Sequence, residues 1–384
     1  MISTLLRRSR VILGAALVPA TLTMVLSAGA PASAEELVYG SWTPAREYMN
    51  EKVLPGIFKD IEADTKGAIK WKLIPGGQIA DGKATFTAVR DNLMQAGLGI
   101  AVYVPALVPS VTAIYSTLLF GEDVGAASAA ALETVALHCP SCLEEYRKIN
   151  AVPLGAWDAA PYKLMCRDPI KTVDDLKGKR IRATGGNAEM LKMAGAVPVA
   201  GTLTEAVNLL QRGGIDCVLG ATDWLRAFGY ADFAKNVSDY PLGMSGPAIG
   251  ILLNRDTWNK FTKEQKTIHL KYAARMSAEM AIDNFITHND QTLAEMIKEK
   301  GVKVIDTDKA SFGKLVADYQ KIQGERNAKV AEGFGVKDPA PIIAAYEKSF
   351  EKWKGLSKSI GKDTKKLGDA IWNEVYSKID VEKF

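Results

Sequence analysis

Alternating apolar and polar positions mark the strands near the start of the chain. Residues 69–74, Ile-Lys-Trp-Lys-Leu-Ile, alternate apolar and basic side chains, as a strand with one buried face does. A similar run covers residues 36–42, and an apolar strand is expected at 98–102. Helices are expected between these strands, at 49–65 and 84–92. Strands that alternate with helices predict a mostly parallel sheet covered on both faces.

A long helix is predicted after Thr262. The segment Thr262-Lys-Glu-Gln265 is a capping box, in which the two end side chains bond each other's backbone N–H groups. From there apolar residues recur at helical spacing up to Gly301, which predicts a helix on the order of 55 Å long. Residues 308–384 predict three more helices. Their separators are Gly333-Phe-Gly335, Pro339-Ala-Pro341 and Gly361.

The segment from Lys171 to Gly220 holds the strongest candidate for a ligand contact. Its extended Arg180-Ile-Arg182 run leads to a glycine pair, just before a helical segment. Such a strand places Arg182 at the carboxyl edge of a sheet, where open α/β folds bind their ligands. The planar guanidinium is suited to pairing with a carboxylate. The alternative for any single arginine is a solvated surface position.

Four sequence blocks in this segment occur in an order that is typical of one family. They are Asp-Asp-Leu-Lys-Gly at 174–178, Gly-Ala-Val-Pro-Val at 195–199, Glu-x-x-x-x-Leu-Gln at 205–211 and Gly-x-x-Asp at 213–216. In these blocks the chain resembles the substrate-binding proteins of tripartite ATP-independent periplasmic (TRAP) transporters, the dicarboxylate-binding-protein-like family. The resemblance reaches Pro75-Gly-Gly-Gln78 and Asn254-Arg-Asp-Thr-Trp258, and it covers most of residues 36–305.

The resemblance implies an α/β periplasmic binding protein fold of two lobes, with mixed sheets flanked by helices, a long lobe-spanning helix and a helical C-terminal tail. The chain is expected to cross between the lobes twice and so to form a hinge that closes on a ligand. The expected parts are a signal peptide at 1–34, the first part of domain I at 35–158, domain II at 159–246, the return to domain I at 247–287, and the rest of the long helix with C-terminal helices packed on domain II at 288–384.

Aromatic residues at strand ends are candidates for the walls of the cleft. Trp42, Tyr103 and Trp157 each lie at or just beyond the end of a predicted strand. Their rings offer a large contact area, and Tyr and Trp add a polar group. Packing in the core or at its rim is the alternative for each of them.

The resemblance implies ligand contacts from two strands of domain II. Arg182 would pair with a ligand carboxylate, and the end of the strand at 216–220 would reach into the cleft. The candidates at that second strand end are Gly220, Asp223 and Trp224. Asp223 has an alternative role as a helix cap.

Two positions depart from acid-binding relatives such as the sialic-acid binders. Those relatives have a second arginine near the position of Tyr162, and an asparagine in place of Gly220. A dicarboxylate or a sugar acid would lose partners at both places, so the retained Arg182 favours a monocarboxylate. The alternative ligand is a small amine, held by Asp223 and by cation–π contacts with the aromatic candidates.

The N-terminus predicts export. Three arginines within residues 7–10 precede an apolar run at 11–26, and Ala32-Ser-Ala34 offers the small residues that signal peptidase needs. We therefore expect cleavage before Glu35 and a periplasmic protein. A membrane anchor is the alternative, and the short, interrupted apolar run disfavours it.

Four cysteines in an exported chain predict disulfides, for which three pairings exist. We expect Cys139 to pair with Cys142, and Cys166 with Cys217, because the latter two lie on the strands that bracket the arginine segment. A redox role for the Cys-Pro-Ser-Cys pair would need a thioredoxin-like βαβ unit, and the sequence before it predicts a helix instead. No metal and no other cofactor is expected, because the three histidines have no second cluster of ligands beside them.

Composition and charge exclude several classes of protein. The chain of 384 residues is 47% hydrophobic and 24% charged, which is ordinary for a globular protein. Its net charge of +4 gives no argument for binding nucleic acid. An enzyme is not expected, because the sequence has no P-loop, no Gly-x-Ser-x-Gly elbow and no dinucleotide fingerprint.

The sequence thus predicts an extracytoplasmic solute receptor that binds a small organic acid between its lobes and delivers it to TRAP permease subunits. Its expected partners are that ligand and the permease, with no nucleic acid and no stable membrane insertion. The alternative is the same fold reporting ligand occupancy to a membrane sensor.

Overall fold

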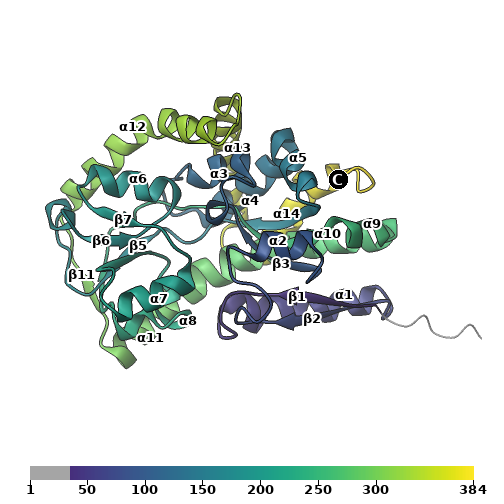
Figure 1. Cartoon of the computed structure of the whole chain (residues 1–384), viewed down its shortest axis with the longest axis horizontal. Helices are drawn as coiled ribbons and strands as arrows, with labels where there is room; N and C mark the ends of the chain where they lie inside the picture. The colour runs from purple at the N-terminus through teal and green to yellow at the C-terminus, as the bar shows by residue number, and fades with distance from the viewer. Residues whose placement is uncertain (1–34) are drawn as a thin grey trace, which may run out of the picture. The chain divides into compact units, whose positions relative to one another are not determined.

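Two separate mixed sheets form the framework of the chain (Figure 1). The structure is a computed structural model that describes residues 35–384, so the predicted signal peptide at 1–34 lies outside the described residues. The strands of the first sheet are β1 (Glu35–Gly40), β2 (Ile69–Ile74), β3 (Ala96–Ile100), β4 (Ala151–Trp157) and β10 (Ala248–Asn254). Those of the second sheet are β5 (Lys163–Cys166), β6 (Arg180–Arg182), β7 (Val197–Val199), β8 (Cys217–Gly220), β9 (Asn236–Ser238) and β11 (Lys303–Ile305).

The helices that flank these sheets are mostly short. They are α1 (Leu54–Asp64), α2 (Thr85–Arg90), α3 (Pro109–Ser116), α4 (Val124–Glu133), α5 (Pro140–Lys148), α6 (Gly185–Met193), α7 (Leu203–Gln211), α8 (Trp224–Ala227), α9 (Arg255–Lys260), α10 (Lys263–Ala278), α11 (Asn289–Lys300), α12 (Lys309–Gly333), α13 (Ala340–Ile360) and α14 (Thr364–Glu374). Among residues 35–384, no helix is both long and apolar enough to cross a membrane.

The first sheet has the strand order β2-β1-β3-β10-β4. β1 pairs in parallel with β2 and β3, whereas β10 is antiparallel to both of its neighbours. The strand predicted at 69–74 coincides with β2, and the strands predicted at 36–42 and 98–102 agree with β1 and β3 to within about two residues, which is the usual uncertainty of element ends. This half of the chain therefore follows its hydrophobic pattern closely.

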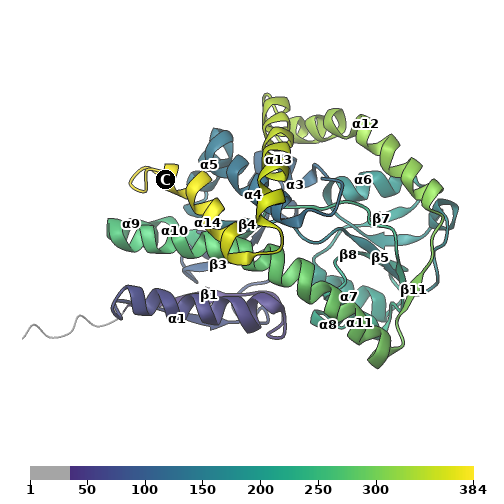
Figure 2. The ribbon, with the colours of Figure 1, turned by 180° about the vertical axis from the view of Figure 1, so that it is seen from behind.

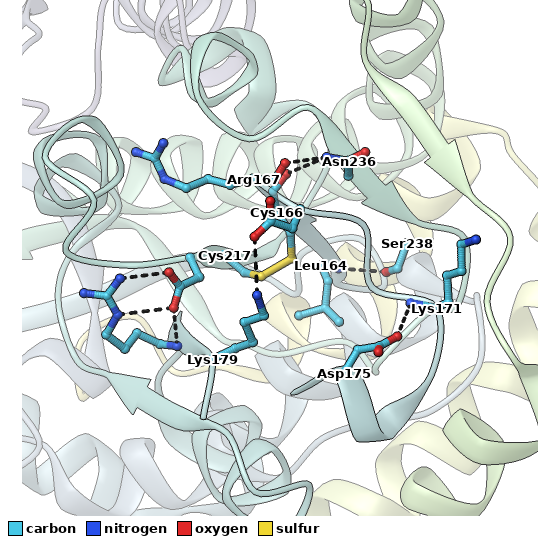
Figure 3. The surroundings of a disulfide bond; sticks show 12 residues. Leu164, Cys166, Arg167, Lys171, Asp175, Lys179, Cys217, Asn236 and Ser238 are labelled. Carbon is cyan, nitrogen blue, oxygen red and sulfur yellow. Dashed lines mark hydrogen bonds and ion pairs between the residues drawn. A yellow bond between two sulfur atoms is a disulfide. The ribbon is translucent and has the colours of Figure 1, made fainter. Parts of the chain in front are cut away.

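The second sheet has the order β11-β9-β5-β8-β6-β7. Cys166 of β5 lies opposite Cys217 of β8 in the antiparallel register, and the two form a disulfide (Figure 3). The Asn236 side chain donates to the Arg167 carbonyl oxygen at 2.6 Å and so ties β9 to the end of β5. A cross-link within the sheet thus lies one strand away from β6, which ends at Arg182.

Cys139 and Cys142 form the other disulfide, at the start of α5. Both predicted pairings are therefore confirmed. A π-helix (Thr134–His138) precedes α5 where a thioredoxin-like unit would have a strand, as the sequence predicted.

The chain crosses between the two lobes at 158–162 and 239–247, and these segments run side by side. The Tyr162 N–H donates to the Gly243 carbonyl at 2.9 Å, and the Ala159 N–H donates to the Ser245 carbonyl at 3.2 Å. The two segments therefore connect the first sheet to the second as an adjacent pair.

The predicted long helix runs without a break from Lys263 to Lys300, but its middle part, Glu279–His288, is a π-helix. Thr262 and Gln265 form the predicted capping box, and Gly301 ends the helix in the left-handed conformation, with φ of 66°. α10 packs on β4, while α11 packs on α8 beside the second sheet. The helix therefore spans both lobes (Figure 2).

The three predicted C-terminal helices are present as α12, α13 and α14. α12 contacts both α3 and α6. α13 packs on α4 and α14 packs on α10, which differs from the expected packing on domain II. The reason is that α4 is alanine-rich and wholly buried, so that Tyr346 and Trp353 of α13 approach it closely.

Candidate functional site

A cavity enclosed by aromatic side chains lies where strands of both sheets end. Six of the eight predicted binding residues line it, and the other two, Gly220 and Asp223, do not. The six are Trp42, Tyr103, Trp157, Tyr162, Arg182 and Trp224. Residues more than 180 positions apart in the sequence thus meet in one place because their strands end at the interface of the lobes.

Arg182 provides the positive charge of the cavity. Its side chain is 3% exposed, its Nε donates to the Gly201 carbonyl at 2.9 Å, and its Nη2 donates to the Tyr103 hydroxyl at 3.2 Å. Burial disfavours the charged guanidinium, but the phenols around it, Tyr103 first among them, leave its pKa raised overall. Within residues 35–384, no carboxylate lies within ion-pair distance of it, so this buried cation has no anionic partner in the described chain.

Arg180, two residues earlier on the same strand, shows the contrast. Its guanidinium pairs with the Asp216 carboxylate at 2.8 Å, and its side chain is 44% exposed. The two arginines point to the same side of β6 because side chains alternate along a strand. Only Arg182, at the strand end, reaches the cavity.

Edge-to-face ring contacts hold the aromatic walls in place. The ring of Trp42 lies 5.8 Å from that of Tyr103, and the ring of Tyr162 lies 5.4 Å from that of Trp224. The Trp42 Nε1 donates to the Leu98 carbonyl at 3.0 Å, which fixes the indole. Such walls favour a ligand with an apolar body and a charged end that meets Arg182.

Gly220 contributes to the cavity indirectly, because its missing side chain leaves space for the Trp224 indole. A Cβ atom on Gly220 would lie 2.2 Å from Cζ3 and 2.3 Å from Cε3 of Trp224. The indole thus rests directly on the backbone at the end of β8. The departure from asparagine at this position therefore makes room for an aromatic wall.

Replacing Gly220 with alanine is expected to displace the Trp224 indole. The overpacking should lower the free energy of unfolding by about 1–3 kcal/mol, and tryptophan emission should change in the ligand-free protein. Urea unfolding followed by fluorescence measures both effects. The control is Gly324→Ala in α12, where an added Cβ meets nothing within 4 Å and alanine is the better helix former. Equal effects of the two substitutions would contradict the proposed role of Gly220.

Asp223 lies behind the cavity wall, next to Trp224. It is 2% exposed, its side chain makes no cap hydrogen bond, and both of its carboxylate oxygens lack a hydrogen-bond partner. Burial, and then the charge of Glu47, raise the pKa of Asp223 well above its usual range. The alternative role as a helix cap is therefore wrong.

Several lining residues were not predicted from the sequence. Glu47 could have been a candidate by the same reasoning as the other strand-end residues, because it follows the turn after β1. Burial raises the pKa of its carboxyl to about 7. Five of the others come from helices, a helix end and a crossing segment, where no sequence signal separates a lining position from a core position. They are Tyr115, Phe228, Ser245, Met280 and Phe285.

Residues 41–325 match the family model described as bacterial extracellular solute-binding protein, family 7. A solute-binding protein of Albidiferax ferrireducens is 24% identical over 266 residues, which are 67% of this chain and 75% of that protein. A monocarboxylate 2-oxoacid-binding periplasmic protein of Nostoc sp. is 22% identical over 311 residues, which are 79% of each chain.

Solved structures share the fold at low sequence identity. A TRAP solute-binding protein from Rhodoferax ferrireducens, in complex with copurified benzoate, has a TM-score of 0.74 at 13% identity and covers 84% of this chain and 99% of its own. A marine metagenome TRAP solute-binding protein specific for aromatic acid ligands has a TM-score of 0.73 at 19% identity, with coverages of 83% and 99%. These likenesses show the two-lobed fold.

Proposed function

The chain belongs to family 7 of the bacterial extracellular solute-binding proteins, and from this membership we propose that it binds a small organic monocarboxylate in the cavity around Arg182. The family and fold are those of TRAP solute receptors and not of enzymes. We also propose that it acts in the periplasm after loss of residues 1–34, and that it delivers its ligand to TRAP permease subunits.

The observation that carries this proposal is the buried, unpaired guanidinium of Arg182. A buried charge is costly unless a partner compensates it. A ligand carboxylate in the cavity would provide that partner through charge-assisted hydrogen bonds. The Nostoc relative and the benzoate complex are named for monocarboxylate ligands, which is consistent with this choice.

Contacts between the lobes support binding by closure. The Tyr103 hydroxyl of the first lobe accepts hydrogen bonds from Arg182 and from the Leu203 N–H at 3.3 Å, both in the second lobe. At the surface, the Lys83 ammonium pairs with the Glu205 carboxylate at 2.6 Å. We propose that domain I comprises 35–158 and 247–287, that domain II comprises 159–246, and that they move about the crossing segments.

A thermal-shift screen of the ligand-free mature chain tests the proposal. Organic acids, amino acids, amines and polyols would each be added to protein refolded from denaturant. A ligand at about 100 times its dissociation constant adds roughly 2.7 kcal/mol of stability, so monocarboxylates are expected to raise the unfolding midpoint. A response to polyols alone, or to no class of ligand, would contradict the proposal. Failure in every class would favour the alternative role in signalling.

A further inference from the structure

Three buried polar side chains beside the cavity have atoms without hydrogen-bond partners. A monocarboxylate bound to Arg182 would not provide these partners. The three side chains are Glu47, Asp223 and Asn284, which are 6%, 2% and 0% exposed. Both carboxylate oxygens of Asp223 and both amide atoms of Asn284 lack a hydrogen-bond partner. The Trp224 N–H and the Asn284 side chain lie close enough to the Asp223 carboxylate to oppose the rise of its pKa, but neither reaches hydrogen-bond geometry. Buried polar groups are normally paired, so this cluster needs an explanation.

One member of the cluster lines the cavity, and the other two lie next to residues of its wall. Glu47 itself lines the cavity, and it precedes the π-helix Met49–Val53, which packs on the π-helix Glu279–His288 that carries Asn284. Asp223 is fixed from behind, because its N–H donates to the Asn289 side-chain oxygen at 3.0 Å. The sequence neighbours of the cluster also form the wall. These neighbours are Trp224, Met280 and Phe285.

No cation of the described chain compensates the two acids. Within residues 35–384, neither Glu47 nor Asp223 takes part in an ion pair, and the adjacent Arg46 donates to the Ala227 carbonyl at 2.9 Å instead. One Glu47 oxygen accepts the Met49 N–H at 3.0 Å, which leaves its other oxygen free to meet a ligand. Burial raises the pKa of both carboxyls, and a ligand cation beside the free Glu47 oxygen would favour its charged form. With such a ligand bound, the cavity carries one positive charge, on Arg182, and one negative charge, on Glu47.

We propose, as a refinement of the function proposed above, that the ligand is a zwitterion whose carboxylate binds Arg182 and whose protonated amine binds Glu47. A neutral molecule with two opposite charges matches this charge pattern. Arg182 and Glu47 form no ion pair with each other although both line the cavity, so the ligand has to keep its two charged groups apart. The aromatic side chains of the cavity complete the amine site through cation–π contacts. The acid and amine alternatives from the sequence then describe two ends of one ligand.

Two matched ligand series test this proposal on the refolded, ligand-free mature chain by calorimetric titration. The aliphatic series is butyrate, 4-aminobutyrate and succinate, and the aromatic series is benzoate, 3-(aminomethyl)benzoate and isophthalate. In the series that binds, the amine-bearing acid is expected to bind about 10–100-fold more tightly than the parent acid, as a charged hydrogen bond implies. The dicarboxylate is expected to bind more weakly than the parent acid.

Substitutions locate the amine site. Glu47→Gln keeps the side-chain size and should reduce the advantage of the amine-bearing acid to less than about threefold, with the parent acid affected little. Asp306→Asn, at an exposed ion pair with Lys309, is the matched control and should retain the full advantage. Ligand-free unfolding midpoints check that the variants fold.

The outcomes separate the two proposals. If no acid of either series binds, the monocarboxylate function itself fails. If the parent acids bind through Arg182 but the amine adds nothing, or if its advantage survives Glu47→Gln, the zwitterion proposal is overturned and the monocarboxylate function stands.

Discussion

Arg182→Ala is expected to weaken carboxylate binding by on the order of 10²–10³-fold, since removing one partner of a buried ion pair costs about 3–5 kcal/mol. The size of the effect follows from how the guanidinium is held. The Gly201 carbonyl and the Tyr103 hydroxyl engage Nε and Nη2. The remaining nitrogen, Nη1, is left for the ligand, and the guanidinium is fixed before the ligand arrives.

Calorimetric titration of the ligand-free mature chain with the best monocarboxylate of the screen measures this loss. Arg180→Ala is the matched control, because Arg180 lies on the same strand but pairs with Asp216 at the surface. Its affinity for the acid should stay within about twofold of the parent chain, as expected for a surface pair. Unchanged affinity in Arg182→Ala would remove the anchor from the proposal, and an equal loss in both variants would point to damage to β6 instead.

The variant Arg182→Lys separates the contribution of positive charge from that of guanidinium geometry. A lysine keeps the positive charge but cannot bond the Gly201 carbonyl and a carboxylate in the planar geometry of a guanidinium. We expect intermediate affinity, because charge alone restores part of the attraction. A lysine variant as weak as the alanine variant would show that geometry, rather than charge, dominates recognition.

Much of the fold could be predicted because local patterns and tertiary structure agree. The alternation at 69–74 gave β2 its bounds, and the capping box at Thr262 fixed the start of the long helix. The π-helical middle part, Glu279–His288, carries the same apolar spacing as its neighbours and has no sequence signal of its own. The packing of α13 on α4 depends on which surfaces meet, and periodicity alone does not contain that information.

The candidate site could be predicted where residues follow directly from strand ends. Arg182 and Trp157 are the last residues of β6 and β4, and both reach the cavity. The resemblance placed Gly220 and Asp223 by strand order, but the indole of Trp224 rests on Gly220, which has no side chain to exclude it, and Asp223 is buried outside the cavity lining. The sequence therefore located the correct strand end, and side-chain volume decided which residue there forms the wall.

The Cys166–Cys217 disulfide carries the second large expected effect, on stability. Its cysteines are 51 positions apart, whereas those of the other disulfide are 3 apart. In the chain-entropy account, a cross-link restricts the unfolded chain more when its loop is longer. The estimate is a loss of about 4 kcal/mol for Cys166→Ala/Cys217→Ala and about 2 kcal/mol for Cys139→Ala/Cys142→Ala.

Position in the sheet reinforces this difference. Cys217 lies on β8, whose Val218 is paired with Arg182 of β6, so the cross-link supports the strand that presents Arg182 to the cavity. Urea unfolding of the two double variants and the parent chain, under non-reducing conditions, gives the free energies to compare. The 166/217 variant should unfold at the lower urea concentration, while both variants keep their affinity for the ligand as long as they are folded. Equal losses would indicate that native packing, rather than loop length, sets the contribution of each disulfide, and a loss of affinity in the folded 166/217 variant would show that the cross-link also positions β6 for binding.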